Sequence, residues 1–139
     1  MKVKDVMHPG ASWVDPETPL PDIAERMRKD DIGAIPIGEN DRLVGMVTDR
    51  DIVVRGLRRK DDMMKLKARD VMTRNIIFCM ADEELDDAVR IMERKQVRRL
   101  PVIDRNKRMV GMLSLGDVAA RANPSLCSET LRAVSAHHA

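Results

Sequence analysis

Residues 45–51, GMVTDRD, recur near the other end of the chain as residues 111–117, GMLSLGD. Both stretches read glycine, two apolar residues, a hydroxyl residue, two variable positions and aspartate. An apolar run that ends in a hydroxyl residue, with an acid three residues later, is typical of a strand that leads into a capped helix. The recurrence therefore predicts a fold made of two copies of one unit.

The repetition extends over nearly the whole chain. KVKDVM at residues 2–7 matches KARDVM at residues 67–72, an offset of 65 residues. At this offset, apolar, proline and aromatic positions of the first copy fall on similar residues of the second: Trp13 on Phe78, Leu20 on Leu85, Ile23 on Ala88, Ala24 on Val89, Met27 on Met92 and Pro36 on Pro101. One extra residue in the turn 104–108 raises the offset to 66. Two copies thus account for residues 2–122.

Each copy has the hydrophobic pattern of a β-α-β-β-α unit. The spacing of Leu20, Ile23, Ala24 and Met27 predicts one face of a helix, with Thr18 as its N-cap and Asp82 as the N-cap of its repeat. The other predicted elements are a leading strand around Trp13 and Phe78, strands over 34–37, 43–48, 100–103 and 109–114, and second helices over 49–57 and 115–122.

The predicted fold class is α+β. A three-stranded sheet with two helices on one face is too small to bury its own apolar surface. We therefore expect the two repeats to pack sheet to sheet with pseudo-twofold symmetry. The predicted organisation is repeat 1 at 1–57, a charged connector at 58–66, repeat 2 at 67–122 and a C-terminal helix or tail at 123–139. The tail carries a weak apolar stripe of Leu126, Thr130, Leu131 and Val134, and it ends in His137 and His138, which we expect to be frayed.

Composition excludes several classes of protein. The net charge of +2 gives no overall field that would attract nucleic acid or an anionic membrane. One Trp, one Phe and no Tyr offer few rings for stacking on bases, so we expect no nucleic-acid partner. The N-terminus lacks the apolar run of a signal peptide, and no stretch is long enough to span a bilayer. We therefore expect no membrane partner and a cytoplasmic location.

The reactive side chains form no recognisable catalytic or metal pattern. Cys79 and Cys127 make no CxxC pair, and neither they nor His8, His137 and His138 have metal-ligand spacing, so no metal is predicted. Cys79 is predicted to be a small core residue on a strand. No nucleophile, base and orienting acid occur in a catalytic order, so we expect no enzyme activity.

The echoed pairs Thr48–Asp51 and Ser114–Asp117 fit two different roles. As capping boxes they would satisfy backbone donors at a helix start. As ligand sites they would place a hydroxyl and a helix N-terminus beside a phosphate, and a carboxylate beside the paired hydroxyls of a ribose. Phosphate plus ribose indicates a nucleotide, and the duplication indicates two sites. The spacing alone leaves both roles open.

Taken together, the DVM openings, the IGAIPI and VRRLPVID strands and the echoed GMVTDRD and GMLSLGD resemble a CBS domain pair, also called a Bateman module. The chain is particularly similar to small stand-alone CBS-pair proteins of bacteria, and the resemblance covers residues 2–122. It implies regulatory binding of an adenosine-containing ligand without a required cofactor. AMP, ADP or ATP is the expected ligand, with S-adenosylmethionine or NAD as rarer ones.

The resemblance also implies two pockets, in which the hydroxyl meets phosphate and the aspartate holds ribose. Each pocket is completed by the other repeat. The first comprises Thr48, Arg50, Asp51, Thr73, Phe78, Val97 and Arg98, and the second comprises His8, Trp13, Ile32, Gly33, Ser114 and Asp117. Arg50 and Arg98 suit phosphate oxygens. We therefore expect a charged ligand in the first pocket.

Trp13 and Phe78 leave an alternative function open. Each ring could stack on adenine or plug a pocket, and plugged pockets would make the chain a dimerisation or protein-interaction module without a ligand. The chain could also be the detached regulatory subunit of an enzyme that the sequence does not name. In each case the resemblance implies a homodimer formed through helices, with Ile52, Val53 and Val118 as the expected contacts.

Overall fold

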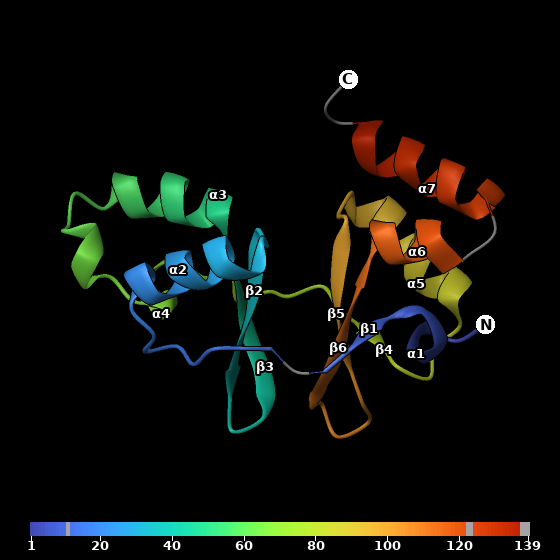
Figure 1. Ribbon diagram of the computed structural model, residues 1–139, viewed down its shortest axis with the longest axis horizontal. Helices are drawn as coiled ribbons and strands as arrows, with labels where there is room; N and C mark the ends of the chain where they lie inside the picture. The colour runs from blue at the N-terminus through green and yellow to red at the C-terminus, as the bar shows by residue number, and fades with distance from the viewer. Residues whose placement is uncertain (11, 122–123, 137–139) are drawn as a thin grey trace. The chain divides into compact units, whose positions relative to one another are not determined.

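The structure is a computed structural model that describes residues 1–10, 12–121 and 124–136 (Figure 1). The chain divides into two compact units. We call residues 12–76 the middle unit, and residues 1–11 together with 77–139 the terminal unit. His137 and His138, predicted to be frayed, lie outside the described residues.

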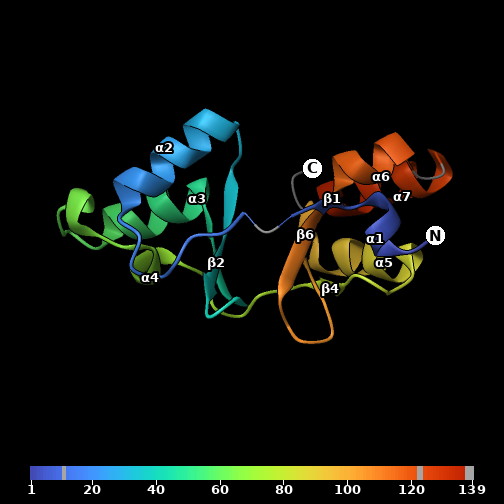
Figure 2. The same cartoon turned by 60° about the horizontal axis from the view of Figure 1, so that its bottom comes forward.

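The middle unit is built on an antiparallel hairpin of β2 (Ala34–Glu39) and β3 (Arg42–Thr48), in which Ala34 pairs with Thr48. The leading strand predicted around Trp13 is reduced to a single parallel bridge between Val14 and Ile37. The helical elements are α2 (Leu20–Asp30), α3 (Asp49–Asp51) with a π-helical turn (Ile52–Gly56), a 3₁₀ turn (Met63–Lys65) and α4 (Ala68–Val71). Both α2 and α3 lie on one side of the hairpin (Figure 1, Figure 2).

The terminal unit contains a four-stranded sheet in the order β1-β6-β5-β4. Its strands are β1 (His8–Pro9), β4 (Cys79–Met80), β5 (Arg99–Ile103) and β6 (Met109–Ser114). Its helices are α1 (Val3–Val6), α5 (Leu85–Lys95), α6 (Leu115–Arg121) and α7 (Pro124–Ser135). The last helix packs against both α5 and α6 (Figure 1). The α+β class and the two tandem β-α-β-β-α repeats are thus confirmed, while the predicted packing of one repeat on the other stays a prediction.

The compact units do not coincide with the sequence repeats, because the leading segments are exchanged. Val3 and Val6 of α1 are buried in the terminal unit with α5 of repeat 2. Ala68 and Val71 of α4 are buried in the middle unit with α2 of repeat 1. Each DVM motif therefore packs on the repeat that it does not open.

This exchange also corrects the predicted helix caps. The N-caps of α2 and α5 are Pro19 and Glu84, without a side-chain cap, and not Thr18 and Asp82. The first N–H group of α2, on Leu20, donates to the carbonyl of Leu66 at 2.9 Å, and that of α5, on Leu85, donates to the carbonyl of Met1 at 2.9 Å. Backbone carbonyls of the exchanged segments thus accept hydrogen bonds at these helix starts in place of the predicted side-chain caps. Asp82 instead pairs with Arg105 at 2.9 Å.

Three predictions about the burial of apolar residues are wrong, and two of the errors follow from the position of α7. Val118, expected at a dimer contact, is fully buried in the core beside Val134 of α7. Leu131, which belongs to the predicted apolar stripe of the tail, is exposed. Ala24 is exposed although its counterpart Val89 is buried, since the contacts of α7 are with α5 and α6 of the terminal unit.

No helix among the described residues has both the length and the apolar character needed to cross a membrane.

Candidate functional site

In the middle unit the echoed stretch lies where β3 passes into α3. The Asp51 N–H donates to Thr48 Oγ1 at 3.0 Å, and the Thr48 N–H donates to Asp51 Oδ2 at 3.0 Å. The Asp49 N–H donates to the carbonyl of Gly33 at 2.9 Å, which ties the helix start to the residue before β2. The predicted capping box is therefore confirmed here.

The terminal unit repeats this arrangement. The Asp117 N–H donates to Ser114 Oγ at 3.0 Å, and the Ser114 N–H donates to Asp117 Oδ2 at 2.9 Å. The Leu115 N–H donates to the carbonyl of Arg98 at 2.9 Å, as Asp49 does to Gly33. The second capping box is thus confirmed as well, with the same local geometry.

The capping boxes leave ligand-binding capacity unused. In each box the hydroxyl oxygen accepts a bond, so its proton remains available to a phosphate oxygen. The carboxylate uses Oδ2, so Oδ1 remains available to accept from a hydroxyl of a sugar. Stability and ligand binding are therefore compatible roles for Thr48 and Asp51, and likewise for Ser114 and Asp117.

The exchange of leading segments brings some predicted site residues together. Thr73 exchanges two backbone hydrogen bonds with Met46, at 2.9 and 3.0 Å, so it lies beside the strand that ends at Thr48. In the same way His8 pairs with Met112, two residues before Ser114. Arg50 is exposed on α3, where its N–H donates to Asp49 Oδ1 at 2.8 Å.

The other predicted residues belong to the opposite unit in each case. Phe78, Val97 and Arg98, predicted for the first pocket, lie in the terminal unit, and Trp13, Ile32 and Gly33, predicted for the second, lie in the middle unit. The composition of each complete pocket therefore stays a prediction.

Within the middle unit, Trp13 does not lie beside Gly33. A Cβ added to Gly38 would lie 1.2 Å from Trp13 Cε3, so the indole ring packs directly on the Gly38 backbone. Gly38 is four residues along β2 from Ala34, about 13 Å at the rise of a strand. Trp13 and Gly33 thus lie at opposite ends of β2.

Sequence reasoning missed one residue of this site, Arg55. Its Nε lies 3.8 Å from Asp51 Oδ1, and its Nη1 donates to the carbonyl of Met72 at 3.1 Å. By sequence, Arg55 begins a basic stretch that runs to Lys60, a pattern typical of a solvated surface. The signal in the sequence was its position four residues after Asp51, one helical turn away.

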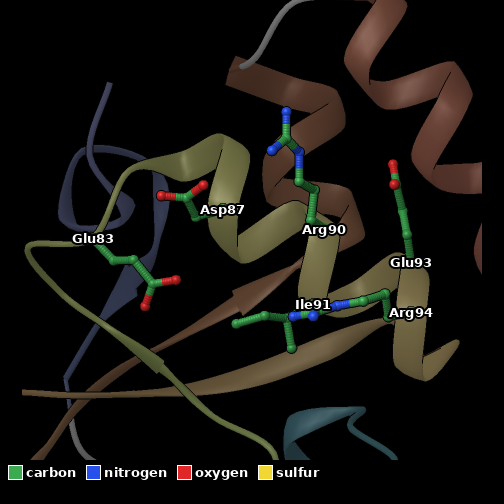
Figure 3. Close-up of a pocket in the computed structure, with 6 residues that line it drawn as sticks. All are labelled: Glu83, Asp87, Arg90, Ile91, Glu93 and Arg94. Carbon is green, nitrogen blue, oxygen red and sulfur yellow. The ribbon is translucent and has the colours of Figure 1, made fainter.

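Hollows in the surface lie mostly away from the predicted residues. One of about 350 Å³ follows α5 and is lined by Glu83, Asp87, Arg90, Ile91, Glu93 and Arg94 (Figure 3). Two hollows of the middle unit measure about 450 and 410 Å³, and Trp13 lines the smaller one. No other predicted site residue lines any of these three hollows.

The described part of the chain holds no cluster of three or more His, Cys, Asp or Glu side chains placed to bind a metal ion. Cys79 is buried on β4, which pairs with β5 in the sheet, and this confirms its predicted place in the core. Burial raises the pKa of its thiol to about 12, with a smaller contribution from the Glu83 carboxylate. This thiol is therefore protonated and unreactive at neutral pH.

The family model for the CBS domain matches the chain twice, at residues 3–57 and 68–123. Hypoxic response protein 1 of Mycobacterium tuberculosis is 39% identical over 117 residues, which cover 84% of this chain and 81% of that protein. A crystal structure of Hypoxic Response Protein I with two coordinated zinc ions has a TM-score of 0.80 and 37% identity, covering 88% of this chain and 100% of that one.

Two further solved structures contain adenosine ligands. CBSX2 in complex with AMP is 26% identical with a TM-score of 0.75, over 86% of this chain and 93% of that chain. The CBS domain pair of protein MJ0100, in complex with 5′-methylthioadenosine and S-adenosylmethionine, is 25% identical with a TM-score of 0.71, over 86% and 94% of the two chains. The two family matches, the relatives and the observed repeats agree: this chain belongs to the CBS domain family and carries two tandem CBS domains.

Proposed function

We propose that the chain is a regulatory module that binds an adenosine-containing ligand, with AMP, ADP or ATP preferred, at the site around Thr48 and Asp51. The observation that carries the proposal is the geometry of the capping box. It fixes the hydroxyl and the carboxylate at the end of β3 by reciprocal bonds of 3.0 Å, and it leaves the hydroxyl proton and one carboxylate oxygen for a ligand.

Similar proteins support an adenosine ligand. CBSX2 with AMP and the MJ0100 pair with S-adenosylmethionine share the fold and at least 25% of the sequence with this chain. In the proposed site, Asp51 accepts hydrogen bonds from the ribose, Thr48 donates to the phosphate, and Thr73 borders the ligand. Phe78, Val97 and Arg98 would complete this pocket, and Ser114 and Asp117 would serve the second.

A charged phosphate favours the first pocket over the second. Arg50 follows Thr48 by two residues and is exposed, whereas Gly116 holds the equivalent position after Ser114. A guanidinium group binds phosphate oxygens with two parallel hydrogen bonds, which a glycine cannot offer. We therefore assign the phosphorylated ligand to the Asp51 site, and we propose no catalytic role for the chain.

A thermal-shift titration tests the proposal. The wild type, Asp51→Asn and Asp117→Asn would each be melted with AMP, ADP, ATP, NAD and S-adenosylmethionine. A ligand at a hundred times its dissociation constant adds about 2.7 kcal/mol of stability. The amide of asparagine has one acceptor oxygen. If that oxygen caps Thr48, a donor rather than an acceptor faces the ribose, so binding is lost while the cap remains.

We expect Asp51→Asn to abolish the shift given by AMP, ADP or ATP, and Asp117→Asn to preserve it. The absence of a shift with every ligand, from a well-folded wild type, would refute ligand binding and favour a protein-interaction module. A shift that is lost only in Asp117→Asn would move the site to the other repeat.

We also propose self-association through the second helix of the middle unit. Val53 and Leu57 are apolar, and they are 56% and 64% exposed. Sedimentation velocity would compare the wild type with a Val53→Asp, Leu57→Asp double variant. A dimer that becomes a monomer in the double variant supports this contact, and a dimer that persists contradicts it.

A further inference from the structure

Arg55 joins three segments of the middle unit. Its Nε lies 3.8 Å from Asp51 Oδ1, the carboxylate oxygen that the capping box leaves unused. Its Nη1 donates to the carbonyl of Met72 at 3.1 Å and lies 3.4 Å from that of Val71. These carbonyls belong to the C-terminal end of α4, where the last carbonyl groups of a helix lack partners within the helix. One guanidinium group thus connects the proposed ribose-binding carboxylate to α4.

The link continues to a second part of the proposed site. The residue after Met72 is Thr73, whose backbone N–H and C=O both bond to Met46 at 2.9 and 3.0 Å. The position of Asp51 relative to Thr73 is therefore set from two sides, by the β3 pairing and by the Arg55 bridge. The Asp51 side chain is only 15% exposed, so its rotation is restricted further by its surroundings.

The bridge distinguishes the two repeats. Arg121 occupies the position equivalent to Arg55, four residues after Asp117. Arg55 lies in the π-helical turn Ile52–Gly56, whereas α6 is α-helical throughout. A π-helical turn holds one more residue than an α-helical turn, which rotates the side chains on it. Among the described residues, Arg121 forms neither an ion pair with Asp117 nor a hydrogen bond to α1.

We propose that Arg55 is a positioning residue of the Asp51 site, an inference that rests on the proposed function. The cation holds the carboxylate with Oδ2 toward the Thr48 N–H and Oδ1 toward the ligand, and it fixes the Met72–Thr73 segment at the same time. A pre-organised acceptor binds the ribose without first being ordered. Arg55 therefore contributes to recognition of the sugar hydroxyls, and the ion pair itself contributes little to folding because the Arg55 side chain is half exposed and its Nε lies 3.8 Å from the carboxylate oxygen.

Calorimetric titration with AMP and with 2′-deoxy-AMP tests this role, because the two nucleotides differ by one hydroxyl group. The proteins are the wild type, Arg55→Gln, Arg55→Lys and the matched control Arg121→Gln. We expect the wild type to bind AMP more tightly than 2′-deoxy-AMP, and we expect Arg55→Gln to reduce this preference about tenfold. Tenfold is the low end of the loss seen when a metal ligand is deprived of the group that orients it. Arg121→Gln should keep the wild-type preference. Lysine carries one point charge and cannot contact both Asp51 and Met72 as a fork does, so Arg55→Lys should lie between.

An equal loss of affinity for both nucleotides in Arg55→Gln would overturn the proposal, because a purely structural role weakens binding without changing sugar discrimination. An unchanged preference in Arg55→Gln would overturn it as well. If Arg55→Gln does not fold, Arg55→Lys decides: an intermediate preference supports the bridge, and a wild-type preference contradicts it. Failure of the wild type to bind any adenosine ligand would instead refute the proposed function, and the wild-type titration separates the two cases.

Discussion

Replacing Thr48 by valine separates the structural and ligand-binding roles of the echoed motif. Valine keeps the branched shape of the side chain and removes only the hydroxyl. The half-buried Asp51 N–H then loses the acceptor that it has at 3.0 Å, while the bond from the Thr48 backbone to Asp51 Oδ2 is retained. Loss of a side-chain cap costs about 1 kcal/mol, within a range of about 0.5 to 2. For a chain of this length that is a fall in Tm of a few degrees.

The assay is thermal and urea unfolding without ligand, followed by the same measurements with AMP. Thr48→Ser, which keeps the hydroxyl, is the control and should unfold within about 0.5 kcal/mol of the wild type. With AMP, Thr48→Val should show a smaller stabilisation than Thr48→Ser, because the phosphate loses a donor. Unfolding of Thr48→Val at the wild-type urea concentration would refute the capping argument. A full AMP shift in the same variant would refute the role of the hydroxyl in binding.

Three further predictions concern the two cores. Gly38→Ala should displace the indole ring of Trp13, the single tryptophan, and so change the intrinsic fluorescence spectrum; an unchanged spectrum would contradict the observed packing. Val118→Ala should lower the free energy of unfolding by about 2 to 3 kcal/mol because Val118 is buried under α7, whereas Leu131→Ala, at an exposed position, should change it by less than about 0.5 kcal/mol in the same urea titration. Because the pKa of Cys79 is raised to about 12, the unfolded chain loses this thiol proton from about pH 9 upward while the folded chain keeps it. Stability should therefore fall above pH 9, by up to about 1.4 kcal/mol per pH unit, and Cys79→Ala should lack this contribution when melted at pH 8 and pH 10.5.

The strands and main helices were predictable because each has a local hydrophobic period. The predicted strand 43–48 is observed as Arg42–Thr48, and the helix through Leu20 and Ile23 as Leu20–Asp30. The capping boxes were predictable for the same reason, since both partners lie within four residues of sequence. Local sequence patterns were therefore sufficient to predict the two capping boxes of the candidate site.

The errors arise where distant residues replace a local signal. Thr18 has the right side chain for a cap, but the Leu66 carbonyl already accepts the first N–H of α2. The sequence predicts Val118 on the surface of a short helix, but α7 covers it in the structure. The π-helical turn around Arg55 has no signature at all in the comparison of repeats, because the two copies have equal length there.

The exchange of leading segments has a consequence for the order of events on the ribosome. The middle unit is one continuous stretch, residues 12–76, so it can fold while the rest of the chain is still being synthesised. The terminal unit cannot do so, because His8 pairs with Met112 and the sheet needs both ends of the chain. Residues 8 and 9 therefore leave the ribosome well before the strand with which they pair. During that interval the apolar face of α1 has no packing partner, although the middle unit has already been synthesised.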